Sequence, residues 1–171
     1  MEPKPKVYDV IDNFLDKKYF NPLYDYLFDN YTAWYPKTFG TVKDMPIDVL
    51  WFSHCLYTDQ QPNVKNYRNL IPPILKALKA RSVIRVTANL VTRQPEQIKT
   101  HFHQDVPYTD SKTAILYINT CNGSTVIKTK KGEDLIKSVE NRLLVFPSNT
   151  YHGSILQSDT DRRVVVNFNY F

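Results

Sequence analysis

The sequence has few cysteines and no long apolar run. Only 2 of its 171 residues are Cys, and Cys55 and Cys121 form no CxxC pair, which excludes a disulfide framework and indicates reduced thiols. No segment approaches the roughly 18 consecutive apolar residues of a membrane span, and the N-terminal residues lack the apolar core of a secretory signal. We therefore expect a cytoplasmic protein with no membrane partner.

The rest of the composition is that of a globular protein of ordinary domain size. Hydrophobic residues make up 42% of the chain and charged residues 23%, which predicts a packed core rather than disorder. We expect a single domain over residues 1–171, with a helical or mixed support at 1–80 and a β-rich core at 81–171. The formal charge of +5 would permit attraction to nucleic acid or other anions.

The periodicity of apolar residues changes near residue 80. Before that point, Leu15–Asn30 and Lys65–Lys79 repeat apolar residues at a spacing of three to four, which predicts two amphipathic helices. After it, the chain divides into short β-rich runs separated by turn residues. Eight strands are expected: Val83–Thr92, Ile98–His103, Thr113–Thr120, Thr125–Lys128, Asp134–Val139, Arg142–Phe146, His152–Leu156 and Arg163–Phe171. This spacing is typical of a sandwich, a jelly roll or a barrel.

Histidines are concentrated in the β-rich half, and they carry the first chemical signal. His103 and Asp105 are two residues apart, so in an extended segment their side chains project from one face and can bind one ion. His152 begins a later predicted strand and adds a third ligand. Two imidazoles and one carboxylate on one side of a metal leave open coordination positions, as non-haem Fe(II) oxygenases require.

Two arginines follow this histidine at the start of the last predicted strand. Alternation places Arg163 on the polar face and Arg162 on the apolar face of that strand. A buried arginine near a metal would bind a carboxylate through charge-assisted hydrogen bonds. We favour Arg163 for this role, with Arg162 as the alternative.

Residues 83–171 resemble the 2-oxoglutarate and Fe(II)-dependent dioxygenases. The resemblance lies in the HxD pair His103/Asp105, in His152 and in the arginine that follows it. The likeness is greatest to small, single-domain, prolyl-4-hydroxylase-like members encoded by bacteriophages, for which the location would be the host cytoplasm. The resemblance implies a mainly β fold with flanking helices: a double-stranded β-helix (jelly roll, cupin-like) with N-terminal helices packed on one sheet.

The same resemblance implies the chemistry and the residues that perform it. Decarboxylation of 2-oxoglutarate to succinate would be coupled to hydroxylation of a primary substrate, with Fe(II) and dioxygen. His103, Asp105 and His152 would bind the iron. Arg163 and the Tyr117 hydroxyl would bind the distal carboxylate of 2-oxoglutarate.

Further polar residues on the predicted strands could line the pocket, although each could also be an ordinary strand residue. They are Arg85, Asn89, Thr125, Asn167 and Asn169. The segments Trp51–Asn63 and Pro107–Lys112 are candidates for the rim of a substrate cleft. The primary substrate stays open between a protein side chain, a nucleic-acid base and a small metabolite.

Two other interpretations compete. His101, His103 and Asp105 also begin the HxHxDH motif of metallo-β-lactamase-type zinc hydrolases, but Val106 stands where the last histidine should be. In an iron site, His101 would share a strand face with His103 and Asp105 and would be a neighbour of the metal ligands or simply exposed. The second alternative is a non-catalytic, basic jelly-roll binding module, associated with nucleic acid or a virion. Such a module has no reason to carry both histidines, the aspartate and the arginine together.

Overall fold

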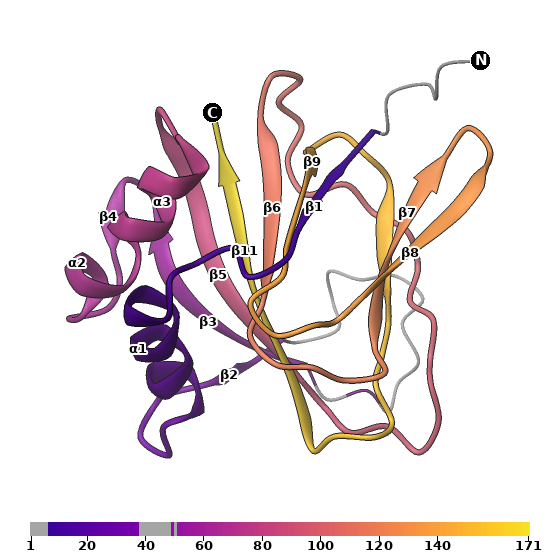
Figure 1. The fold of residues 1–171 in the computed structure, drawn as a ribbon, viewed down its shortest axis with the longest axis horizontal. Coiled ribbons are helices and arrows are strands. Elements are labelled where there is room, and N and C mark those ends of the chain that lie inside the picture. The colour runs from indigo at the N-terminus through magenta and orange to yellow at the C-terminus, as the bar shows by residue number, and fades with distance from the viewer. Residues whose placement is uncertain (1–6, 38–48, 50) are drawn as a thin grey trace.

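The computed structural model describes residues 7–37, 49 and 51–171, and it is a jelly roll of two antiparallel sheets with helices on one side (Figure 1). The larger sheet contains β1 (Asp9–Ile11), β9 (Leu143–Pro147), β6 (Lys112–Tyr117), β11 (Arg162–Tyr170), β5 (Val83–Thr92), β3 (Trp51–Thr58) and β2 (Tyr35–Pro36) in that order, with β4 (Gln61–Pro62) paired to β3. The smaller sheet has the order β10 (His152–Ile155), β7 (Ser124–Thr129) and β8 (Gly132–Lys137).

The helices cover the outer face of the larger sheet. Helix α1 (Lys17–Phe28) begins where the Asp16 side chain accepts a hydrogen bond from the Lys18 backbone N–H, as an N-cap does. Its buried Leu23 and Leu27 belong to one core cluster with Val166 and Phe168 of β11. The expected packing of N-terminal helices on one sheet is therefore confirmed.

The segment Lys65–Lys79, predicted as one helix, forms two short helices. Helix α2 (Tyr67–Leu70) ends before Pro72, and α3 (Pro72–Leu78) starts with the two prolines at its first positions. Proline lacks the N–H that a continuous helix would need there, but it suits the first turn of a new helix.

Strand β11 lies at the centre of the larger sheet, between β5 and β6. In its register Val165 lies opposite Asn89 of β5 and Tyr117 of β6. Val166 and Phe168 pack under the helices, whereas Val165 packs in a second core cluster with Ile127 and Ile136 of the smaller sheet. The predicted alternation is confirmed: the odd-numbered residues of β11 face the space between the two sheets.

Two elements differ from the sequence predictions. The expected strand Ile98–His103 is wrong, because this segment pairs only through isolated bridges between Lys99 and Ile155 and between His103 and His152. Conversely, Trp51–Thr58, expected only as a rim, is strand β3. The other seven predicted strands correspond to β5–β11 with bounds shifted by a few residues.

Both cysteines are free thiols. Within residues 7–37 and 51–171, no helix has the length and apolar character needed to cross a membrane.

Candidate metal centre

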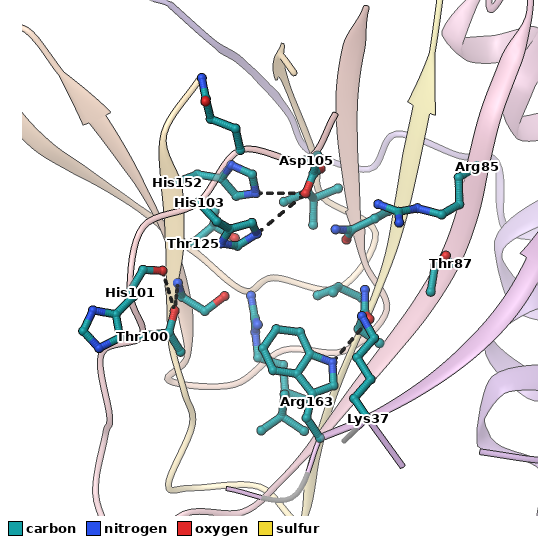
Figure 2. A pocket seen from close by; sticks show the side chains of 18 residues that line it. Lys37, Arg85, Thr87, Thr100, His101, His103, Asp105, Thr125, His152 and Arg163 are labelled. Atoms are coloured by element: carbon teal, nitrogen blue, oxygen red, sulfur yellow. Dashed lines mark hydrogen bonds and ion pairs between the residues drawn. The ribbon is translucent and has the colours of Figure 1, made fainter. Parts of the chain in front are cut away.

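The side chains of His103, Asp105 and His152 meet at the edge of the space between the sheets (Figure 2). His103 and His152 are held side by side by reciprocal backbone hydrogen bonds, 2.9 Å from His103 N to His152 O and 3.0 Å in the other direction. The imidazole Nε2 atoms of both histidines lie 3.6 Å from Asp105 Oδ1. A long loop and the start of β10 thus bring together residues far apart in the chain.

This spacing fits one divalent ion. The three candidate ligand atoms all lie within 4.8 Å of one another. Nitrogen or oxygen atoms each about 2.1 Å from one ion are about 3.0 Å apart at right angles and about 4.2 Å apart when opposite. The two separations of 3.6 Å between the histidine nitrogens and Asp105 Oδ1 fall in this range. A donor set of two nitrogens and one oxygen suits iron with open positions.

Two hydrogen bonds hold the carboxylate of Asp105 in position. Its Oδ2 atom accepts from Thr113 Oγ1 at 2.9 Å and from Asn169 Nδ2 at 3.0 Å, which leaves Oδ1 directed at the histidines. Burial by itself raises the pKa of Asp105, but the adjacent imidazoles of His103 and His152 and the hydrogen bond from Asn169 outweigh it and hold the pKa well below its usual range. Asp105 is therefore a carboxylate at neutral pH, the form that binds a metal.

His152 has the tautomer that a ligand needs. Its Nδ1 lies 3.1 Å from the carbonyl oxygen of Thr150, which can only accept, so Nδ1 carries the proton. The lone pair of Nε2 is then free to face an ion, an arrangement common around metal-bound histidines. The ring packs 4.7 Å from that of Phe146, which restricts its orientation.

A cavity of about 350 Å³ adjoins the three residues, between the two sheets. Arg163 reaches into it from β11, and Arg85 and Lys37 also line it (Figure 2). Ile115 and Val165 supply apolar wall. The cavity is large enough for a small organic ligand.

Arg163 is a buried cation without an anion. It is 3% exposed, its Nε donates to Ser138 Oγ at 2.7 Å, and its guanidinium lies 5.6 Å from the centre of the Tyr117 ring. Across the described part of the chain, no carboxylate forms an ion pair with it. Burial lowers the pKa of Arg163, which reflects the cost of an unpaired buried charge. An anionic ligand in the cavity would remove that cost.

Tyr117 lies behind the cavity wall rather than in it. Its hydroxyl donates to Thr125 Oγ1 at 2.7 Å, and burial raises its pKa to about 12, so it stays a neutral donor. Thr125 lines the cavity. Because its oxygen accepts from Tyr117, its own proton is free to bond a ligand.

The structure places the other expected residues in several environments. Asn89 and Asn167 line the cavity, whereas Asn169 is fully buried behind Asp105. Arg162 lies on the opposite face of β11, with its guanidinium 4.6 Å from the Phe28 ring centre. His101 borders the cavity, but its ring points away from the three ligands (Figure 2).

Of the two segments expected at the rim of a substrate cleft, only the first contributes to the cavity. Trp51 lines the cavity, but His54 of the same strand faces α1, where it bonds the Tyr26 hydroxyl. The loop Pro107–Lys112 contributes no residue to the cavity wall.

Sequence reasoning missed the residues that hold the ligands. Thr113 and Ser138 support Asp105 and Arg163 through single hydrogen bonds. Threonine and serine are common on strands, and no spacing pattern marks these two. Thr113 does have one weak signal, since it shares the odd-numbered face of its strand with Tyr117.

Comparison with solved structures finds the same fold in iron oxygenases. A 2OG-Fe(II) oxygenase family oxidoreductase from Burkholderia pseudomallei superposes with a TM-score of 0.72 at 12% identity over 96% of this chain and 85% of that one. A Trichoplax adhaerens prolyl hydroxylase, in complex with a peptide fragment of the oxygen degradation domain of hypoxia inducible factor, gives 0.69 at 12% identity, covering 96% and 83%. A prolyl-4-hydroxylase from Pseudomonas putida gives 0.63 at 16% identity, covering 96% and 92%. No protein-family model and no curated protein matches the sequence.

Proposed function

We propose that this protein is a non-haem Fe(II) oxygenase that consumes 2-oxoglutarate. The observation that carries the proposal is the joint placement of two groups around one cavity: three residues that fit a divalent ion, and a buried arginine without an anionic partner. A metal alone would not need the arginine, and an anion-binding protein would not need the three ligands. The shared fold of known iron oxygenases supports the same conclusion.

Each residue has a defined task in this proposal. His103, Asp105 and His152 hold the iron, and Arg163 with the Thr125 hydroxyl orients the distal carboxylate of 2-oxoglutarate. Bound iron, with 2-oxoglutarate and dioxygen, supplies the oxidation that yields succinate and a hydroxylated substrate. Ile115 and Val165 exclude water from the cosubstrate.

The residues that bind the iron and 2-oxoglutarate do not determine the class of the primary substrate. A peptide is bound in one structural neighbour. A protein side chain, a nucleic-acid base and a small metabolite all remain compatible with the fold, since fold alone does not determine substrate. A phage source and a cytoplasmic location stay predictions from the sequence.

The direct test is an anaerobic titration of the protein with Fe(II) and then 2-oxoglutarate. Chelation of the cosubstrate should produce a visible metal-to-ligand charge-transfer band, and His152→Ala should abolish it. Arg163→Gln should demand about tenfold or more 2-oxoglutarate for the same absorbance, whereas Arg162→Gln, the matched control, should not. A wild-type protein that binds neither component would overturn the proposal and favour the basic binding module.

A further inference from the structure

A second pair of cations borders the cavity, apart from the proposed cosubstrate anchor. Arg85 of β5 donates from Nη2 to Asn169 Oδ1 at 3.2 Å, and Asn169 in turn bonds Asp105. Lys37, which like Arg85 is an exposed residue, has its ammonium 5.5 Å from the centre of the Trp51 ring. Both line the cavity (Figure 2).

The register of the sheet separates Arg85 from Arg163. Arg163 lies opposite Val91 of β5, whereas Arg85 lies opposite Asn169 of β11. Six residues along a strand correspond to about 20 Å between the two backbone positions. The two arginines therefore approach the metal centre from different directions and suit different anions.

Charge balance leaves the second pair unmatched. Among the described residues that line the cavity, the cations are Lys37, Arg85 and Arg163, and the carboxylate is Asp105. A divalent ion cancels the two charges of 2-oxoglutarate, and Asp105 cancels Arg163. Arg85 and Lys37 remain, and within the described ranges neither forms an ion pair. Desolvation and then the charge of Arg85 lower the pKa of Lys37, and the smaller opposite effect of Asp105 does not offset them, so the two cations repel each other.

Neutral groups on the same wall complete a polar strip. Thr87 and Asn89 share the face of β5 that carries Arg85. Asn89 is 6% exposed, and its Oδ1 accepts from Trp51 Nε1 at 3.3 Å. No described residue accepts from its amide nitrogen, which is therefore available to a ligand in the cavity.

We propose that the primary substrate of this oxygenase presents an anionic group, a carboxylate or a phosphate, to Arg85, with Lys37 as a second cation at the same cavity. The inference rests on the proposed function, because the anion must bind while 2-oxoglutarate occupies Arg163. It narrows the substrate to molecules whose negative group and reacting carbon can occupy the same cavity of about 350 Å³.

The test uses nuclear relaxation by Mn(II) in the metal site, with saturating 2-oxoglutarate. Mn(II) relaxes nuclei of any molecule bound close to it, so the probes are acetate, its neutral isostere acetamide, and inorganic phosphate. Acetate or phosphate should be relaxed several-fold more than acetamide in the wild type. Arg85→Gln should weaken this anion binding by about tenfold, while Arg85→Lys should retain most of it.

Arg68→Gln, which removes an exposed charge on α2, is the matched control and should behave as the wild type does. Stronger relaxation of acetate than of phosphate would indicate a carboxylate substrate, and the reverse a phosphate. Equal relaxation of acetate and acetamide, or an unchanged excess in Arg85→Gln, would overturn the inference while leaving the oxygenase proposal intact. Failure of Mn(II) itself to bind would overturn both.

Discussion

Gly123 controls the position of Arg163. A Cβ atom at residue 123 would lie 2.9 Å from Arg163 Cδ and 3.0 Å from the carbonyl oxygen of Ile155. Since the backbone oxygen cannot move aside, we expect Gly123→Ala to displace the guanidinium. The dissociation constant for 2-oxoglutarate should rise by about tenfold with unchanged metal affinity, as measured by calorimetry. Lys130→Ala, at an exposed position near the turn between β7 and β8, is the control. Equal cosubstrate affinities in the two variants would contradict this account.

Thr113 controls the carboxylate ligand in a similar way. Its hydroxyl donates to Asp105 Oδ2, and the Thr113 side chain is fully buried. Thr113→Val keeps the shape but removes the donor, so metal affinity should fall by about 10- to 100-fold, the usual effect of losing such a supporting group. Competitive Co(II) titration measures the loss. Thr113→Ser should restore most of the affinity; if the valine variant binds Co(II) as the wild type does, the hydrogen bond does not position Asp105.

At the scale of residues, the sequence predicted the candidate ligand-binding residues but not the residues that hold them in position by hydrogen bonds. Spacing and alternation, together with the family resemblance, selected His103, Asp105, His152 and Arg163, because side-chain direction in extended segments follows a period of two. The same rule could not assign Tyr117, which the structure places one layer behind Thr125. Hydrogen bonds from Thr113 or Ser138 depend on contacts between strands, which a single sequence does not reveal.

At the scale of elements, a histidine joins α1 to the sheet. His54 of β3 is 7% exposed; its Nδ1 lies 2.7 Å from the Ala33 carbonyl, and its Nε2 lies 2.9 Å from the Tyr26 hydroxyl. Burial, opposed by the Ala33 bond, lowers the pKa of His54 from its ordinary 6.5. The unfolded chain therefore takes up this proton at a higher pH than the folded chain does.

It follows that His54 makes the protein less stable in acid. The free energy of unfolding should be unaffected above the unfolded pKa and should decline as the pH falls below 6.5, with a slope from this residue of at most about 1.4 kcal/mol per pH unit. Urea unfolding at pH 7.5 and pH 5.5 measures the decline. His54→Gln should show a smaller difference between the two pH values; an identical difference would assign the pH dependence to other groups.

Element prediction succeeded where pairing is regular. Strand β5 has the predicted bounds, and β11 and β6, the next two strands of the same sheet, lie close to theirs. The prediction failed at 98–103, where the chain follows β10 with only two bridges and then turns to bring His103 against His152. That departure serves the metal centre, and local propensity could not anticipate it. Strand β3 escaped notice because its residues must pack on both faces of the sheet, so their polarity does not alternate cleanly.

For the whole molecule, ligands should contribute to stability. A ligand present at 100 times its dissociation constant stabilises the folded state by about 2.7 kcal/mol. For a chain of this size that corresponds to a rise in Tm of about 5–10 °C. We expect Mn(II) and then 2-oxoglutarate each to raise the Tm in thermal unfolding. Arg163→Gln should retain the first rise and lose most of the second, and a variant that keeps both rises would exclude Arg163 as the anchor.

The central place of β11 also sets the order in which the protein can be assembled during synthesis. Strands β5 and β6, which flank β11 on either side, are both translated before it. A nascent chain that stops before residue 162 thus presents two unsatisfied sheet edges and lacks both Arg163 and the Asn169 that supports Asp105. Closure of the sheet and completion of the site are one event, so a partly synthesised chain has neither a stable fold nor the capacity to retain its cofactors.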